Sequence, residues 1–305
     1  MADEWAYEEA SEQEKLQLAQ HFLLSSPPGQ VHEVVRDVAK LVPPRVLTDA
    51  ALRGALHAYN VQSLLPVDVP DADYKASCSL LWRTSLEAVE ILICEEAEVD
   101  PTHYIDPIGN RVFGFDHVKQ EILADDVAEI PEALVSSTFE KDRRRVQKDL
   151  QSYLQFEYMH GGTAGVYVKG SKIVVNLCTE RVNLRNFWSG RWKSHWELDL
   201  TANPSRVIGK IELHVHYFEN GNLQLKNAKL VDEEVSFDRP NGLGDALLSV
   251  MKTAEDALQS ELEDMYINMS QETFKEMRRV MPVTQTKMEW SLHAHRTARD
   301  LGGRK

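Results

Sequence analysis

The chain has 305 residues, of which 43% are hydrophobic and 27% charged, so it can bury one large core or two ordinary ones. It carries no run of about 18 uncharged apolar residues and no basic start followed by an apolar stretch, which favours a cytosolic location over a membrane span or secretion. Three cysteines without CxxC spacing indicate neither a disulfide framework nor a zinc ribbon, and we expect buried free thiols.

Apolar residues recur at helical spacing in three stretches of the first 60 residues. These stretches cover residues 16–23, 31–38 and 50–56, with a stop at Pro43 before the third. The pattern predicts an N-terminal layer of helices over residues 1–62.

Residues 63–153 form a mixed segment that is rich in Pro and Asp up to residue 112. Its apolar stretch from Cys78 to Cys94 fits either a helix or a buried strand. A further helix is predicted from about Pro131 to Tyr153.

Beyond the helix the pattern changes to a period of two, which is typical of strands. Short turns separate the apolar runs, and strands do not alternate with helices, so we expect an antiparallel sheet over residues 154–240 and an α+β fold. The runs cover residues 166–168, 172–178, 191–200, 207–218 and 222–237.

A long helix is predicted over residues 241–281, because apolar residues follow one another at steps of three or four. The stripe consists of Leu247, Met251, Ala254, Leu258, Leu262, Met265 and Met269. About 40 residues at 1.5 Å each give roughly 60 Å, which is longer than a sheet of this size needs. The surplus apolar surface implies a partner subunit that packs against Met251, Leu258 and Leu262 or shares a core with them.

The end of the chain carries the opposite charge to the rest. From Lys275 onward there are eight Lys and Arg against three Asp and Glu, a net charge of +5, which leaves −19 for the other 274 residues. A basic arm on an acidic body suggests a charged partner. The alternative is a basic terminus that is solvated and binds no partner.

The sequence gives no support for catalysis, a cofactor or a resident metal, because no phosphate-binding, dinucleotide-binding, nucleophile-elbow or zinc-protease motif occurs. His214 and His216 share one face of a strand and could bind zinc, but further ligands at suitable spacing are missing. Hydrogen bonding on the sheet is the expected role. A structural hydrogen bond is also expected at Asp116 and His117.

Three tryptophans, Trp188, Trp192 and Trp196, lie four residues apart and so face one way on an extended strand. One interpretation is a stacking platform for single-stranded nucleic acid. The other interpretation is a core or a subunit interface. The net negative charge of the rest of the chain favours this second interpretation, because it repels the phosphates of a nucleic acid. The basic residues between the tryptophans, on the other face, are Arg191, Lys193 and His195.

Several long motifs resemble the alpha subunit of the F-actin capping protein heterodimer. They span most of the chain in the family's order: SPPGQVHEVVRDV at 26–38, FDHVKQE at 115–121, NFWSGRWKSHW at 186–196, VHYFENGNLQL at 215–225 and TFKEMRRVMPVTQTKMEW at 273–290. The resemblance implies a non-enzymatic protein with N-terminal antiparallel helices, an antiparallel sheet shared with a beta subunit, a long helix over that sheet, and a mobile basic tail at 282–305. It also implies a cytoplasmic, cytoskeletal protein that binds the barbed end of an actin filament without calcium and blocks subunit addition and loss.

The resemblance assigns actin binding to the tail, since actin is acidic and basic side chains would form charge-assisted contacts with it. The residues that match the family's motif, or stand beside it, are Lys275, Arg278, Arg279, Lys287, Trp290 and Arg296. Gln285 departs from the motif, since animal members carry an arginine there. Lys275, Arg278 and Arg279 could also bind acidic phosphoinositides, which regulate the family.

Residues 76–91 have no counterpart in the family pattern, and we interpret them as an insertion of about 15 residues. Two other functional classes stay open at this point: a nucleic-acid-binding module that uses residues 186–196, and an enzyme with an unrecognised site. Salt-sensitive binding to single-stranded DNA would support the first of these, and a saturable metal or substrate the second.

Overall fold

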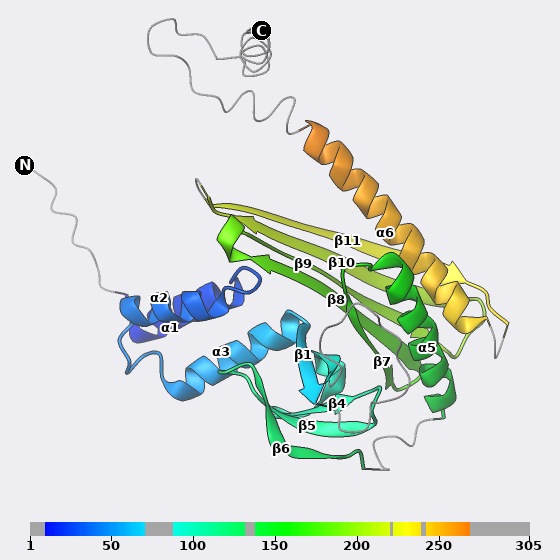
Figure 1. The fold of residues 1–305 in the computed structure, drawn as a ribbon, viewed down its shortest axis with the longest axis horizontal. Coiled ribbons are helices and arrows are strands. Elements are labelled where there is room, and N and C mark those ends of the chain that lie inside the picture. Colours follow the sequence, from blue (N-terminus) through cyan, green and yellow to red (C-terminus); the bar gives the residue numbers. More distant parts are fainter. Residues whose placement is uncertain (1–9, 71–87, 132–137, 220–221, 239–241, 269–305) are drawn as a thin grey trace, which may run out of the picture. The chain divides into compact units, whose positions relative to one another are not determined.

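The computed structural model describes residues 10–70, 88–131, 138–219, 222–238 and 242–268 (Figure 1). The chain divides into two compact units, residues 1–251 and 252–305. The first unit contains three N-terminal helices and an antiparallel five-stranded sheet, and a long helix follows toward the C-terminus. The predicted α+β class is therefore confirmed.

The three N-terminal helices form where the apolar spacing predicts them. They are α1 (Glu12–Leu24), α2 (Val31–Leu41) and α3 (Asp49–Gln62). The Ser11 hydroxyl accepts from the Glu14 N–H at 3.3 Å and the Glu14 carboxylate accepts from the Ser11 N–H at 2.8 Å, a capping box that fixes the start of α1. Val31 of α2 packs with Leu56 and Tyr59 of α3, so the helices share a small buried cluster.

Two small sheets follow, which the sequence pattern did not predict. A hairpin is formed by β1 (Leu65–Pro70) and β2 (Ala88–Ile93), and after η1 (Glu95–Ala97) an antiparallel meander is formed by β3 (Glu98–Asp100), β4 (His103–Asp106), β5 (Arg111–Asp116) and β6 (Glu121–Glu129). The described part of the ambiguous stretch that ends at Cys94 is thus largely strand. The strands are short and their turns use aspartate, as where Asp106 Oδ1 accepts from the N–H groups of Ile108 and Gly109. Such short strands carry little periodicity of their own.

Helix α5 spans Glu140–Glu157, so it begins and ends later than predicted. The described residues directly before it, 138 and 139, form a turn. It buries Val146 and Leu150 and packs on the first strand of the large sheet. The buried Arg143 donates through Nη1 to the carbonyl oxygens of Pro107 and Val166, at 3.0 and 3.2 Å. That guanidinium joins α5, the β4–β5 turn and the large sheet.

The large sheet is an antiparallel meander of five strands in the order β11-β10-β9-β8-β7 (Figure 1). The strands are β7 (Thr163–Lys169), β8 (Lys172–Asn183), β9 (Trp188–Asp199), β10 (Ser205–Tyr217) and β11 (Leu223–Val235), with η2 (Leu184–Asn186) between β8 and β9. All five predicted runs are strands. The alternation of inward and outward residues sets the register, in which Trp196 lies opposite both Val175 and Gly209.

A buried cluster connects the small sheets to the large one. Tyr104, Phe113 and Phe115 of the meander are almost fully buried and belong to the same cluster as Tyr167 of β7 and Cys178 of β8. This packing fixes the face of the large sheet on which the small sheets lie.

The last described helix is α6 (Leu243–Asn268). Its predicted apolar stripe is buried at Leu247, Met251, Ala254 and Leu258, and Leu262 is half-buried. The rest of the predicted helix, residues 269–281, lies outside the described residues. No helix in the described part of the chain combines the length and the hydropathy that a membrane span needs.

Candidate functional site

The actin-binding residues that the sequence predicts all lie beyond the last described helix. Lys275, Arg278, Arg279, Lys287, Trp290 and Arg296 are therefore outside the described residues, and so is most of the predicted insertion. The last residues of that insertion, 88–91, belong to β2 and pair with β1. The geometry that bears on function lies in the large sheet.

The tryptophan face of β9 is packed rather than open. Trp196 is fully buried, and its ring lies over Gly209, where an added Cβ would stand 2.2 Å from ring carbons. Trp188 and Trp192 are half-buried on the same face. The indole nitrogens of Trp192 and Trp196 have no hydrogen-bond partner among the described residues. A face in which one of the three indoles is fully buried does not offer three rings for stacking.

The basic residues on the other face of β9 are engaged with other parts of the fold. The buried Arg191 donates through Nε to Glu180 Oε2 at 2.7 Å and lies 5.7 Å from the centre of the Tyr59 ring. Lys193 donates to the carbonyl oxygen of Gln62, at the end of α3. Because Arg191 and Lys193 are hydrogen-bonded to residues of β8 and α3, residues 186–196 do not form an open basic surface for phosphate.

His214 and His216 are each hydrogen-bonded to amide side chains, as expected. His214 Nε2 lies 3.1 Å from Gln224 Oε1, and His216 contacts Gln30 through Nδ1 at 2.9 Å and Asn222 through Nε2 at 3.2 Å. Burial lowers the pKa of His214 to about 4, so it is neutral near pH 7. The described residues contain no group of His, Cys, Asp and Glu suited to a metal ion.

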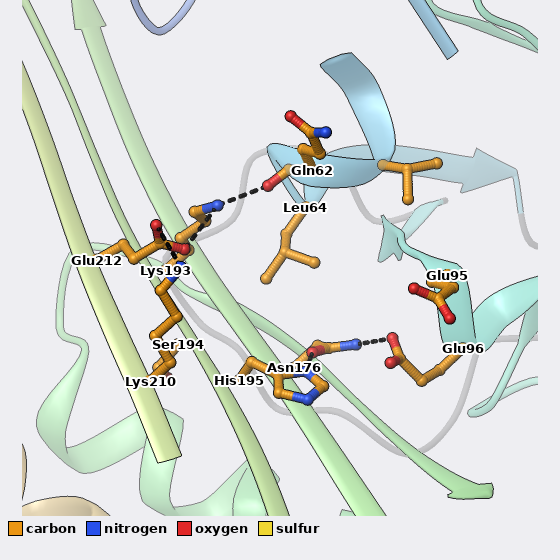
Figure 2. Close-up of a pocket in the computed structure, with 11 residues that line it drawn as sticks. Gln62, Leu64, Glu95, Glu96, Asn176, Lys193, Ser194, His195, Lys210 and Glu212 are labelled. Atoms are coloured by element: carbon orange, nitrogen blue, oxygen red, sulfur yellow. Dashed lines mark hydrogen bonds and ion pairs between the residues drawn. The ribbon is translucent and has the colours of Figure 1, made fainter. Parts of the chain in front are cut away.

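A pocket of about 380 Å³ lies between the end of α3, η1 and strands β8 to β10 (Figure 2). Its charged residues bind one another: Glu212 accepts from Lys193 at 2.9 Å and from Lys210 at 3.0 Å. Asn176 donates to Glu96 at 2.7 Å. The bonds of Glu212 lie within the large sheet, whereas the Asn176–Glu96 bond joins β8 to η1. The residues that line the pocket present no nucleophile–base pair.

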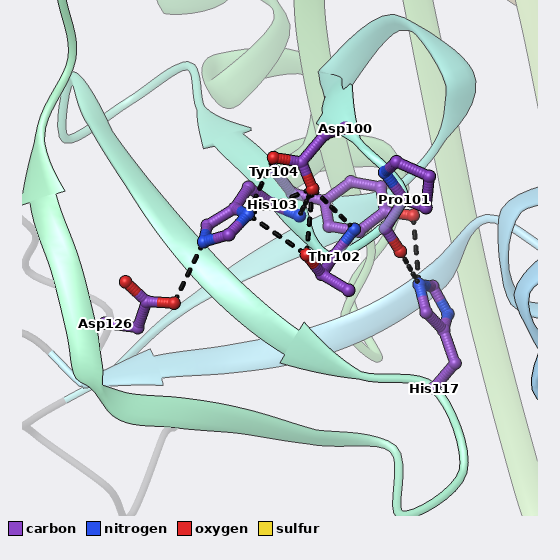
Figure 3. Close-up of polar contacts among 7 residues, drawn as sticks. All are labelled: Asp100, Pro101, Thr102, His103, Tyr104, His117 and Asp126. Atoms are coloured by element: carbon purple, nitrogen blue, oxygen red, sulfur yellow. Dashed lines mark hydrogen bonds and ion pairs between the residues drawn. The ribbon is translucent and has the colours of Figure 1, made fainter.

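A second polar cluster, in the β3–β6 meander, contains His103 and His117 (Figure 3). His103 lies between two carboxylates, 2.8 Å from Asp100 Oδ2 and 2.9 Å from Asp126 Oδ2. Its hydrogen bond to Asp100 raises the pKa of His103 and lowers the pKa of Asp100 to about 2. These bonds hold the β3–β4 turn against β6.

His117 is buried and makes the structural hydrogen bonds expected of it. Asn60 Nδ2 lies 3.2 Å from its Nδ1, and the carbonyl oxygen of Pro101 lies 3.1 Å from its Nε2. Burial lowers the pKa of His117 to about 4. Its neighbour Asp116 accepts from the N–H of Val118 at 2.9 Å and so closes the β5–β6 turn.

Strand β11 is the feature of the sheet that sequence reasoning missed as a site. It pairs with β10 over 13 residues, while its other edge has no strand beside it in the described part of the chain. It is exposed along most of its length, with Leu230 at 78% and Leu223 at 52%. A long exposed edge is a template for pairing with a second chain. Only the strand order could reveal it, because the sequence does not say which strand is outermost.

Comparisons with known proteins agree with this architecture. The model of the family described as "F-actin capping protein alpha subunit" matches residues 19–300. Relatives described as "F-actin-capping protein subunit alpha" include one from Dictyostelium discoideum, 31% identical over 288 residues, and one from Caenorhabditis elegans, 28% identical over 290 residues. These alignments cover 92% and 93% of this chain and 95% of each relative.

Among solved structures, the fold is similar to that of the homodimeric actin capping protein alpha subunit from Plasmodium berghei. The TM-score is 0.67 at 22% sequence identity, and the match covers 89% of this chain and 98% of the other. The family model covers nearly the whole chain, including the helices, the large sheet and the C-terminal segment. This chain therefore belongs to the F-actin capping protein alpha subunit family.

Proposed function

We propose that this chain is the alpha subunit of a heterodimeric capping protein that binds the barbed ends of actin filaments and blocks subunit addition and loss there, without needing calcium. The observation that carries the proposal is the match to the capping protein alpha family over residues 19–300. The family consists of non-enzymatic, actin-binding proteins of the cytoskeleton. The proposed location is accordingly the cytoplasm, on the actin cytoskeleton.

The exposed edge of β11 supports the need for a beta subunit. A strand of 13 residues that is open to solvent on one edge gains hydrogen bonds when a second sheet continues it. The exposed Leu223 and Leu230 would add apolar contact at such a junction. We infer that the beta subunit adds its own sheet at β11. We also infer that Trp188 and Trp192, which are half-buried in this chain, become buried when the two subunits associate.

Actin binding is assigned to residues 275–281 and to the basic C-terminal segment 282–305. The cations among these residues would attract the acidic filament before apolar contact forms, since charge acts over a longer range; three of them are Lys275, Arg278 and Arg279. Lys287 and Arg296 of the tail would add to this attraction, and Trp290 would supply apolar contact. Gln285 removes one cation from this set, which lowers the expected electrostatic contribution.

The same three cations at 275–279 are proposed to bind acidic phosphoinositides, in competition with actin. The test is sedimentation with liposomes that contain phosphoinositide, using the heterodimer with Lys275, Arg278 and Arg279 all changed to Glu. Binding that is unchanged in this variant would exclude the site.

The decisive experiment is the elongation of pyrene-labelled actin from filament seeds, with this chain co-expressed with a capping protein beta subunit. A second heterodimer ends after Pro282. Inhibition of barbed-end elongation that weakens in the shortened protein supports both the function and its assignment to the tail. A folded heterodimer without any effect on elongation would refute the proposal.

A further inference from the structure

Strand β11, an edge strand of the large sheet, carries opposite charges in its two halves (Figure 1). Its charged residues are, in chain order, Lys226, Lys229, Asp232, Glu233 and Glu234. Arg206 of β10 pairs with Asp232 and lies opposite Glu234, so it balances one of the three carboxylates. The strand is therefore basic toward its beginning and acidic toward its end.

The neighbouring strand β10 does little to cancel the charge of the basic half. His214 lies opposite Lys226 and is neutral near pH 7, because burial lowers its pKa to about 4. Glu212 lies beside this half, but it already accepts from two lysines of the sheet. Lys229 interacts within the chain, so the exposed Lys226 is the cation better placed to contact a second chain.

Apolar residues of β11 are arranged symmetrically with these charges. Leu230 is 78% exposed and stands midway between Lys226 and Glu234 in the sequence. All three side chains are exposed on one face of the sheet, because residues two apart on a strand point the same way. On the other face the half-buried Leu225 and Val235 are equally far from Leu230 in the sequence. Reversing the direction of the strand about Leu230 thus places opposite charges at equivalent positions.

We propose that two copies of this chain pair through β11 when no beta subunit occupies this edge, antiparallel and about a two-fold axis at Leu230. In this register Leu230 lies opposite its own counterpart, and Lys226 lies opposite Glu234 of the second copy. Leu225 then lies opposite Val235 of the second copy. The axis repeats every contact, so each charge pair and each apolar pair forms twice.

Main-chain hydrogen bonds along residues 225–235 join the two sheets into one. The outer edge of β11 has no strand beside it in the part of the chain that the structure describes. The N–H and C=O groups on such an edge are satisfied when an antiparallel strand is added. Pairing along 225–235 uses nearly the whole strand, whose bounds are Leu223–Val235.

Other ways of pairing two copies fit the side chains less well. A parallel arrangement would set the two basic halves beside each other. A two-fold axis at Lys229 would oppose that lysine to itself. An axis at Val231 would pair a shorter stretch and oppose the exposed Leu230 to Asp232. An arbitrary extended peptide would gain the main-chain hydrogen bonds without the charge pairs.

This self-association concerns the edge that we assign to the beta subunit, and it does not depend on actin binding. Two partners that need the same edge compete for it. We therefore expect an added beta subunit to convert the homodimer into the heterodimer. Capping and self-association can be measured separately, so each can fail without the other.

The test uses the full chain expressed alone, and its mass in solution is measured by sedimentation velocity at micromolar concentration. The original chain is compared with Lys226→Glu, with Glu234→Lys and with an equimolar mixture of these two variants. The matched control is Lys119→Glu, which changes the net charge as Lys226→Glu does, at an exposed position outside the large sheet. Far-UV circular dichroism verifies that each protein folds.

The original chain and the control should sediment with twice the mass of one chain. Each single variant should dissociate at least about tenfold more readily, because both of its symmetric charge pairs become pairs of like charge. In the mixture the two altered positions face each other and the two unaltered residues face each other. All pairs are then of opposite charge, so the dimer should return, which a variant that failed to fold could not produce.

A disulfide test locates the two-fold axis, with Cys78 changed to Ser and the buried Cys94 and Cys178 retained. Leu230→Cys should form a disulfide with its own counterpart under mild oxidation, because directly opposed strand residues lie within disulfide reach. In the control Ala228→Cys, the two cysteines would be about 13 Å apart, since they are four residues out of register. This control should not cross-link.

Several outcomes would overturn the inference. A chain that is monomeric alone, or that is insoluble unless the beta subunit is present, does not close its own edge. A dimer that survives both single substitutions, or a mixture that fails to regain it, places the contact elsewhere, as does equal cross-linking of Ala228→Cys. If the chain alone is monomeric and the heterodimer caps, this inference fails and the proposed function stands. If the homodimer forms as expected and the heterodimer does not cap, the opposite holds.

Discussion

Gly209 is the position at which the packing of the large sheet can be tested most sharply. It lies in β10 directly opposite Trp196 of β9, and an added Cβ would stand 2.2 Å from two ring carbons and 2.9 Å from a third. Because Cβ atoms essentially never lie closer than 3 Å to another heavy atom, the indole ring or the backbone would have to move. Trp196 is fully buried, so its ring has no open space into which it can shift. The substitution Gly209→Ala therefore forces the two strands or the ring apart.

The expected size of the effect follows from two opposing contributions. Overpacking a filled core costs about 1–3 kcal/mol. Replacing a strand glycine by alanine returns about 0.5–1 kcal/mol, because alanine loses less backbone entropy on folding. We expect Gly209→Ala to lower the free energy of unfolding by about 1–2 kcal/mol, which is about a 5- to 30-fold change in the unfolding equilibrium constant.

The matched control is Gly190→Ala in β9, where an added Cβ meets nothing closer than 3.8 Å. This variant should be as stable as the original or slightly more stable. Urea titration followed by circular dichroism gives both free energies. A double variant that also carries Trp196→Leu should show coupling between the two positions, because the clash is removed. If Gly209→Ala proves as stable as Gly190→Ala, the indole does not pack over Gly209.

Three further predictions concern buried ionisable groups. The pKa of His117 is lowered to about 4, so between pH 6.5 and 4 the unfolded chain takes up a proton at this residue and the folded chain does not. The free energy of unfolding should therefore fall as the pH drops from 6.5 to 4. In His117→Gln this dependence of the unfolding free energy on pH should be weaker. Arg191→Ala should cost about 3–5 kcal/mol in a urea titration, because it leaves Glu180 charged and half-enclosed; a loss below 1 kcal/mol would contradict this. Burial raises the pKa of Cys94 and Cys178 to about 12, so neither should react with a thiol reagent at pH 8 until urea unfolds the chain; rapid labelling of either would contradict their burial.

Local pattern was sufficient where an element is long and one of its faces is buried. The three N-terminal helices and all five strands of the large sheet lie where apolar spacing predicts them, because helix and strand expose different periodicities. The boundaries of α5 were less accurate, since no capping side chain marks its start at Phe139. The two small sheets were missed because strands of three to nine residues, interrupted by turns, contain too few alternations to define a period.

The same distinction, between what the local sequence pattern predicts and what it does not, applies to the candidate site. The basic residues from Lys275 to Arg296 are defined by sequence motifs alone. The sequence also placed the tryptophans and the intervening cations on opposite faces of one strand, since residues alternate along it. It could not say that Arg191 is neutralised by Glu180, or that Lys193 reaches the end of α3, 131 positions away in the chain.

The sequence by itself determined the elements, their faces and the family, because each depends on residues that are close together in the chain. The tertiary structure decided which strand forms the open edge of the sheet, which charges have partners and which do not. These properties depend on contacts between residues far apart in sequence, and only the assembled register of the strands specifies them. The open edge of β11 and the partners of Arg191 and Lys193 could be recognised only after those contacts were known.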